Sequence, residues 1–309
     1  MGASHSHTHD HAAPTSKKAL GAALALTLAY TAVEVVGGLL TGSLALLADA
    51  GHMLSDNISL ALALGAVWLA GRPATSQRTF GYKRAEILAA LVNGVALVVI
   101  ALWIFYAAIQ RFQDPPDVLA GWMLVVAFVG LFVNVGAGLI LYRARGDSLN
   151  IEAAFRHVLA DLLGSIGVIA AALTILLTGW LRADPLISVL IGVLILASAW
   201  SVIRDSTAIL LESTPKGIDA DEVGRRMAGA PGVTQVHDLH VWTITSGFTA
   251  LSAHVLVGAG EDCHLRRREL EVILEHDFGI THTTLQVDHV PEGQLVELTP
   301  RRDTGSSSA

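Results

Sequence analysis

The sequence is poor in cysteine and in charge. Its 309 residues include one cysteine, Cys263, which excludes a disulfide framework within the chain and a zinc site built on several thiolates. Only 15% of the residues are charged, against about a quarter in soluble domains, while 52% are hydrophobic. A net charge of −7 gives no support to a nucleic-acid partner. These figures favour a membrane protein embedded in the lipid bilayer.

Six stretches are apolar and long enough to cross the bilayer as helices, which takes roughly 20 residues each. They cover residues 19–40, 43–70, 87–110, 118–142, 153–178 and 186–209. Breaks such as Gly71-Arg72-Pro73 and Asp184-Pro185 separate them. The first stretch is too long for the core of a signal peptide, so we expect it to be retained. We therefore predict a six-helix transmembrane domain over residues 17–210.

Lysine and arginine are distributed unevenly over the segments that flank these stretches. One side carries Arg111 and Arg182, and the other carries Lys17, Lys18, Arg72, Arg78, Lys83, Arg84, Arg143, Arg145 and Arg204. Cytoplasmic loops of membrane proteins are enriched in lysine and arginine. We therefore predict a multi-pass protein of the cell (inner) membrane with both termini in the cytoplasm.

The chain beyond the sixth stretch has a mixed, charged composition. Residues 211–298 contain helical patterns at 219–229 and 264–276 and strand-like runs at 233–244, 248–257 and 283–290. The order α-β-β-α-β predicts an α+β domain of ferredoxin-like type. The polar ends, residues 1–16 and 299–309, are expected to be disordered. The predicted fold is an α-helical membrane protein with six transmembrane helices and a C-terminal α+β ferredoxin-like cytoplasmic domain.

Two of the apolar stretches carry ionisable residues with the same spacing. His52 and Asp56 lie four residues apart in the second stretch, and His157 and Asp161 lie four apart in the fifth. Residues at i and i+4 share one face of a helix. Because the two helices should be antiparallel, we expect His52 to be level with Asp161. An ionisable group at the bilayer centre costs roughly 2.5–3.5 kcal/mol, so this concentration of charge needs a compensating interaction.

Together the four side chains offer two imidazoles and two carboxylates. Two carboxylates balance the charge of a divalent cation, and four nitrogen and oxygen ligands suit tetrahedral zinc. The absence of cysteine and methionine ligands disfavours Cu(I). Alternatively, the residues form buried His–Asp hydrogen bonds that hold helices together. The repeated spacing in two separate stretches favours the metal site.

Four motifs resemble those of the cation diffusion facilitator family. They are Gly42-Ser43-Leu44-Ala45-Leu46-Leu47-Ala48-Asp49-Ala50-Gly51-His52 with Asp56, Phe80-Gly81-Tyr82-Lys83-Arg84-Ala85-Glu86, His157-Val158-Leu159-Ala160-Asp161, and His237-Asp238-Leu239-His240-Val241-Trp242. The resemblance covers about residues 17–290. It implies a homodimeric six-span exporter that moves Zn²⁺ in exchange for protons. The matching transport-site residues are His52, Asp56, His157 and Asp161.

The same resemblance implies a second metal site in the cytoplasmic domain. It assigns ligand roles to His237, His254 and Asp288, whereas Gln286 stands where the most studied pattern has a histidine. Neighbouring strands make further candidates of His240, His282 and His289. In the N-terminal tail, alternating histidines are either weak metal-capturing ligands or dispensable; they are His5, His7, His9 and His11.

Two more acidic residues lie in the apolar stretches. Asp49 precedes Asp56 by seven residues and so projects to nearly the same helix face, two turns away. It is either a relay for departing ions or protons, or a local hydrogen-bonding group. Glu34 is either part of a proton path or a structural partner of another helix. The polar residues expected to form hydrogen bonds between helices are Asn57, Asn93 and Asn134.

The motifs that are absent leave transport as the main hypothesis. The chain lacks the H-E-x-x-H pattern of metalloproteases and the G-x-x-x-x-G-K-[ST] pattern of ATP-binding loops, so we expect neither an enzyme nor an organic cofactor. Export of a dication against 100 mV costs about 4.6 kcal/mol, which inward proton movement would offset. We expect a secondary transporter that exports Zn²⁺, possible further substrates being Cd²⁺, Co²⁺ and Fe²⁺, for zinc homeostasis or resistance. The alternative is a membrane metal sensor without flux.

Overall fold

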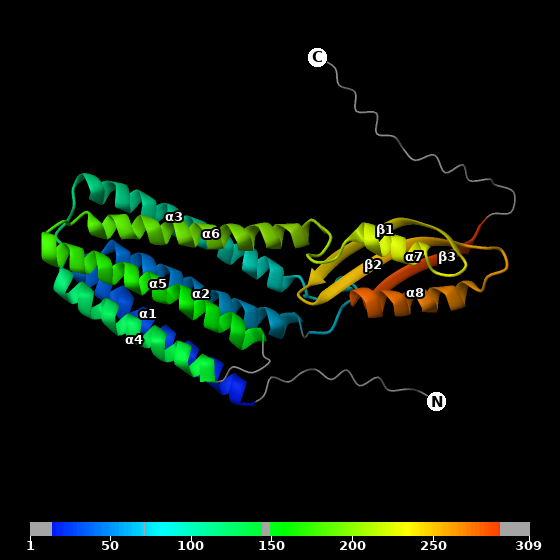
Figure 1. Ribbon diagram of the computed structural model, residues 1–309, viewed down its shortest axis with the longest axis horizontal. Coiled ribbons are helices and arrows are strands. Elements are labelled where there is room, and N and C mark those ends of the chain that lie inside the picture. Colours follow the sequence, from blue (N-terminus) through cyan, green and yellow to red (C-terminus); the bar gives the residue numbers. More distant parts are fainter. Residues whose placement is uncertain (1–13, 71, 144–148, 291–309) are drawn as a thin grey trace, which may run out of the picture. The chain divides into compact units, whose positions relative to one another are not determined.

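The computed structural model describes residues 14–70, 72–143 and 149–290 (Figure 1). The histidines of the N-terminal tail and the predicted tail 299–309 lie outside the described residues. So do the side chains of some helical residues within these ranges, His157 among them. The chain divides into two compact units, one that runs to Thr207 and one that begins at Ala208.

The first unit consists of six long helices. They are α1 (Pro14–Thr41), α2 (Leu44–Ala70), α3 (Ala85–Gln113), α4 (Ala120–Arg143), α5 (Leu149–Thr178) and α6 (Ala183–Leu210). Their breaks follow the turn signals of the sequence. The link between α1 and α2 is only two residues long and contains Gly42 at a φ of 72°, a conformation that glycine adopts without strain.

Five of these helices contain segments long and apolar enough to cross a membrane, as judged from the described residues. The segments are Gly21–Thr41, Ala85–Gln113, Ala120–Arg143, Asp161–Thr178 and Ala183–Leu210. The predicted second span coincides with α2, which is a helix of 27 residues but not one of the five. The structure therefore shows a helical membrane domain with five apolar helices, and the count of six spans remains a prediction.

Each of the helices α1 to α5 packs mainly against one or two others. Helix α1 packs against α2 and α4, α4 against α5, and α2 against α3, whereas α2 and α5 share little contact. Figure 1 shows α3 and α6 running alongside one another. Gly94 allows this approach, because a Cβ atom there would lie 2.8 Å from a side-chain carbon of Ile203 on α6.

Hydrogen bonds between polar side chains link the membrane helices. Ser55 of α2 donates to Asn93 of α3 at 3.0 Å, and Asn134 of α4 donates to Ser165 of α5 at 3.2 Å. Asn57 of α2 also lies 3.4 Å from Thr31 Oγ1 of α1. The interhelical role predicted for the three asparagines is therefore confirmed. Such bonds satisfy polar groups that lipid cannot solvate.

The second unit follows the predicted order of elements. Its elements are α7 (Ala220–Ala228), β1 (Val233–Thr245), β2 (Phe248–Val257), α8 (Cys263–Phe278) and β3 (His282–His289). The sheet order is β1-β2-β3, with β1 antiparallel and β3 parallel to the central β2. The apolar core includes Met227 of α7, Leu251 of β2 and Leu270 of α8.

Aspartates cap both helices of this unit. Asp219 is the N-cap residue of α7, and Asp262 is that of α8, where it accepts hydrogen bonds from the backbone N–H groups of His264 and Leu265. These backbone bonds lower the pKa of Asp262, because they stabilise its charged form. Helix α8 ends at Gly279, whose φ of 67° is the left-handed conformation favoured at helix C-termini.

Candidate metal sites

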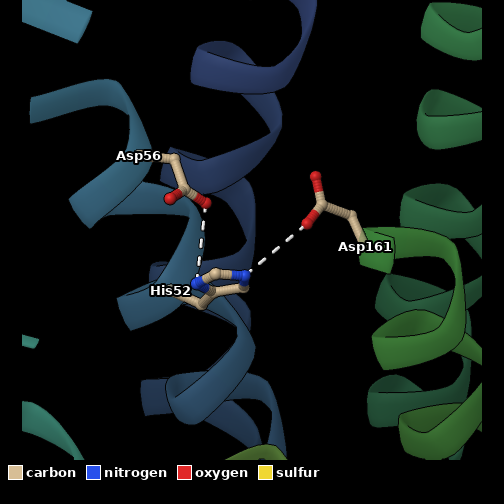
Figure 2. Close-up of side chains that lie close together, drawn as sticks. All are labelled: His52, Asp56 and Asp161. Carbon is tan, nitrogen blue, oxygen red and sulfur yellow. Dashed lines mark ion pairs between the residues drawn. The ribbon is translucent and has the colours of Figure 1, made fainter. Parts of the chain in front are cut away.

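Helices α2 and α5 bring three of the predicted ligands together (Figure 2). His52 and Asp56 lie one turn apart on α2, with His52 Nδ1 3.6 Å from Asp56 Oδ2. On the other side of the ring, His52 Nε2 lies 3.8 Å from Oδ1 of Asp161 on α5. Both ring nitrogens of His52 therefore face a carboxylate.

The separations in this cluster are of the size that a shared cation requires. Around a tetrahedral zinc ion with bonds of about 2.0–2.2 Å, neighbouring ligand atoms lie about 3.3–3.6 Å apart. A direct N–H···O hydrogen bond is shorter, at about 2.7–3.2 Å. One ligand atom of each side chain lies within 4.8 Å of those of the other two. Small side-chain movements would place all three on one ion.

The cluster is largely shielded from solvent. The exposed fraction of the side chain is 5% for Asp161, 20% for His52 and 28% for Asp56. His157, the fourth predicted ligand, precedes Asp161 by one turn on α5, but its side chain lies outside the described residues. Carboxylates that are buried together are stable only when protons or a cation compensate their charge.

Buried acidic groups continue from this cluster toward α1. Asp49 lies against Gly164 of α5, where a Cβ atom would come 2.7 Å from Asp49 Oδ1. The electrostatic environment of Asp49 includes Asp161 and Glu34 of α1. Tyr30 donates a hydrogen bond to Glu34 Oε1 at 3.0 Å. Buried acidic groups therefore extend from the metal cluster to α1.

Asp184 is a buried acid that the sequence patterns did not single out as a site residue. It lies in the first turn of α6, where the sequence indicates a break before an apolar stretch, and it is fully buried. Its carboxylate accepts hydrogen bonds from the segment where α2 begins. An acid beside a proline at the edge of an apolar stretch was the only sequence signal.

In the second unit, β1 and β2 bring the predicted ligands His237 and His254 together. The two residues are direct partners in the antiparallel ladder, and their ring centroids lie 5.4 Å apart. Asp238 sits at a bulge of β1 with a φ of 52°, and its Oδ2 atom lies 4.0 Å from His254 Nδ1. Left-handed backbone at a residue other than glycine is uncommon and often marks a functional position. Strand alternation in the sequence could not reveal this bulge.

The third strand places the predicted acidic ligand on the same face. Gln286 is the partner of His254 on β3, and Asp288 follows two residues later. Residues two apart on a strand share a face, so Asp288 lies one step along from His254. Gln286 donates a hydrogen bond to Asp288 Oδ2 at 2.8 Å. His240 lies on this face as well, opposite the residue two positions before His254.

The other two candidate histidines lie apart from this group. His282 is at the start of β3, and its ring centroid lies 5.2 Å from that of Phe248. Along β3, His282 is four residues, or about 13 Å, from Gln286, the residue opposite His254. His289 alternates to the opposite face, where its Nε2 atom lies 3.5 Å from Cys263 Sγ. The strands therefore bring His240, but neither of these two, close to His254.

Comparison with known proteins shows the family of this chain. The model of the cation efflux transmembrane domain matches residues 20–211, and that of the cation efflux protein cytoplasmic domain matches residues 215–290. The chain belongs to the cation efflux family. The membership that the motifs predicted is thereby confirmed.

Three relatives illustrate the similarity over nearly the whole chain. The cadmium, cobalt and zinc/H(+)-K(+) antiporter of Bacillus subtilis (strain 168) is 46% identical, with 91% of each chain covered. The metal cation efflux system protein CzcD of Cupriavidus metallidurans is 43% identical, with 94% of this chain and 92% of the relative covered. The zinc transporter ZitB of Escherichia coli (strain K12) is 43% identical, with 94% of each covered. A solved structure, the metal-bound C-terminal domain of the CzcD transporter, is 37% identical to this chain, with a TM-score of 0.22. The match covers 23% of this chain and 97% of the chain in that structure.

The cation efflux family defines the broad function of the chain. Its members are multi-pass membrane transporters that export divalent metal cations, and they are not enzymes. The second unit is the cytoplasmic domain of this family, a dimerisation domain. The predictions of cation efflux by antiport and of a non-enzymatic function are therefore confirmed.

Proposed function

We propose that this protein exports Zn²⁺ from the cytoplasm in exchange for protons. The transport site consists of His52, Asp56, His157 and Asp161. The observation that carries the proposal is the position of the His52 ring, whose nitrogens lie 3.6 and 3.8 Å from carboxylates of α2 and α5. The relatives are named for zinc, cadmium and cobalt, and we add Cd²⁺, Co²⁺ and Fe²⁺ as further candidate substrates.

The chemistry of these ligands couples metal to protons. An imidazole binds metal only when its nitrogen is deprotonated, and a carboxylate binds best when ionised. Protons that reach the site from outside therefore compete with Zn²⁺ and promote its release. Each proton that moves inward also offsets about 2.3 kcal/mol per 100 mV of the electrical cost of export. We assign to Asp49 and Glu34 the transfer of protons to or from the site.

For this function we propose that α2 is a sixth transmembrane span. The protein then lies in the inner membrane, with both termini in the cytoplasm. We place the transmembrane domain at residues 17–210 and the cytoplasmic domain at 211–298. We propose that the latter is of ferredoxin-like type, which its α-β-β-α-β order supports. The match to a dimerisation domain supports a homodimer.

We assign a regulatory role to the second group of ligands. His237, His254 and Asp288 lie on one exposed face of the sheet, and Asp238 adds a carboxylate beside His254. Zinc there would act by binding one conformation of the dimer more tightly than another.

The decisive experiment is zinc uptake into vesicles that contain the purified full chain. An imposed pH gradient should drive Zn²⁺ accumulation by the parent protein, and the His52→Ala and His157→Ala variants should lose it while remaining folded and inserted. The relative from Bacillus subtilis is named as an antiporter of both H⁺ and K⁺. Measuring uptake with and without K⁺ would therefore distinguish exchange for protons from exchange for K⁺. Zinc binding without uptake in the parent protein would instead support a metal sensor.

A further inference from the structure

Asp184 links three helices at one end of the membrane unit. Its side chain is fully buried. Oδ1 accepts hydrogen bonds from Ser43 Oγ at 2.5 Å and from the backbone N–H of Ala45 at 3.1 Å, and Oδ2 accepts one from the N–H of Leu44 at 2.8 Å. Arg111 of α3 lies 3.4 Å from Oδ2 and also donates to the carbonyl of Gly42. The carboxylate of α6 thus holds both the start of α2 and a cation of α3.

These contacts satisfy the first turn of α2. The first N–H groups of a helix have no partner within it and carry a partial positive charge. The N–H groups of Leu44 and Ala45 bond to Asp184, and that of Leu46 bonds to Ser43 Oγ, which itself donates to Asp184. A helix capped by a carboxylate of another helix cannot slide along its axis without losing these bonds.

Helix α2 meets α5 at few points along its length, such as Asp49 against Gly164, so the anchor at its first turn helps to fix its height. The two helices that form the metal cluster share little direct contact. His52 lies eight residues beyond Leu44, about 12 Å along the helix, and a shift by one residue would move it by about 1.5 Å. Metal–ligand distances tolerate deviations of only about 0.2 Å.

We infer that Asp184 is a positioning residue for the transport site. By holding the first turn of α2 against the first turn of α6, it sets the height of His52 and Asp56 relative to Asp161. The inference rests on the function proposed above for that cluster. Loss of the anchor should misalign the ligands and weaken zinc binding, while the ligands themselves remain present.

The test compares zinc KM and Vmax for pH-driven uptake by the full chain in vesicles. Asp184→Asn keeps the size of the side chain, but its carboxamide has one acceptor oxygen instead of two, so it cannot accept all the bonds of the carboxylate and it faces Arg111 without a charge. We expect the zinc KM to rise by about tenfold or more, as for other changes that disturb ligand orientation, with a smaller change in Vmax per folded transporter. A residue needed only for folding would lower the amount of active protein and leave KM unchanged.

Arg182→Gln is the matched control. Arg182 lies at the same end and donates to the carbonyl of Phe112 on α3 at 3.0 Å, with no bond to α2 among the described residues. Its loss should leave the zinc KM within about twofold of the parent value, because the α2 anchor stays intact. An equal rise of KM in this variant would overturn the inference, because general loosening of this end would then explain both results.

Two milder variants decide the matter if Asp184→Asn does not fold. Ser43→Ala and Arg111→Gln each remove part of the anchor, and an unchanged KM in both would overturn the inference. If the proposed function itself is wrong, the measurements would differ from those that overturn the inference alone. In that case the parent protein would show no zinc flux, or His52→Ala would transport normally, and the inference would fall with it.

Discussion

Polar side chains are buried between the membrane helices and lie on the surface of the cytoplasmic sheet. Every buried polar or charged side chain among the described residues, from Thr31 to Ser206, belongs to the first unit. That unit exposes large apolar groups instead, such as Phe132 at 71% and Leu177 at 82%. The second unit has an apolar core, and its paired histidines His237 and His254 are exposed.

The difference in burial determines how costly the loss of a metal ligand is in each unit. Between the membrane helices, a ligand that loses its partner is left in a medium that cannot solvate it. On the sheet surface, water can replace a missing ligand at little cost. We therefore expect changes in the first cluster to abolish function and changes in the second to tune it.

The largest contrast should come from removing one carboxylate in each unit. Asp161→Ala should lower zinc flux by about a hundredfold or more, because the change removes a buried ligand and unbalances the charge of its partners. Asp288→Ala, at an exposed position, should lower it by about tenfold at most. Initial rates of zinc uptake, normalised to folded protein, measure both. Similar losses in the two variants would contradict the distinction between the units.

His52→Asp tests the nature of the buried ligands. It replaces a nitrogen ligand by a harder oxygen ligand, so the ratio of zinc to manganese transport should fall on the order of tenfold. Parallel uptake of the two metals gives the ratio, and uptake by Asp56→Glu, which keeps the ligand type, is the control. An unchanged ratio in His52→Asp would count against coordination by this ring.

Gly164→Ala tests how tightly the acidic groups are enclosed. The new methyl group would lie 2.7 Å from Asp49 Oδ1, so Asp49 must move. Overpacking of this kind costs about 1–3 kcal/mol, and zinc flux should fall severalfold. Gly167→Ala on the same helix is the control, because among the described residues its methyl group would meet Ile187 alone, at an ordinary contact distance of 3.4 Å. Thermal unfolding and flux should separate the two variants.

The pair His237→Ala and His254→Ala tests the exposed group. The double change should lower zinc binding by the cytoplasmic domain in the full chain, measured by equilibrium dialysis in a His52→Ala background. In the otherwise unchanged protein it should alter the zinc dependence of transport but leave proton-driven flux measurable, because the group is exposed on the cytoplasmic domain. Complete loss of flux in a protein that still inserts and dimerises would refute the regulatory role.

The smallest effect concerns acid stability of the second unit. Hydrogen bonds from His276 and then Arg226 lower the pKa of Asp277, so its charged form stabilises the fold. This contribution is complete above the ordinary pKa, near about 4, and is lost as pH falls through the lowered value. The melting temperature of Asp277→Asn should therefore lie below that of the parent at neutral pH and approach it in acid. A constant difference down to low pH would exclude this linkage.

The sequence predicted most of the local structure because local signals specify it. The strand expected at residues 248–257 coincides with β2, and the helix expected at 264–276 lies within α8. Alternation of apolar residues marks the strands, and an aspartate and a glycine mark the limits of α8. The pair His52 and Asp56 followed from spacing alone, since i and i+4 share a helix face.

Contacts between distant segments could not be predicted in this way. Asp184 lies 141 residues from Ser43, and no periodicity connects them. The bulge that turns Asp238 toward His254, and the alternation that carries His289 to Cys263, depend on strand register. Register changes the face of every side chain but leaves the composition of the strand unchanged.

The sequence by itself determined that the chain enters a membrane, approximately where its helices lie, and which four residues are suited to a divalent cation. Those features depend on composition and on spacing within one segment. The pairing of His52 with Asp161 was expected from antiparallel helices, but only the tertiary structure decided the separation of the two side chains across α2 and α5, and that Asp184 caps α2 from α6. The reason is that buried polar groups must find partners wherever packing places them, and packing joins residues that the sequence keeps far apart.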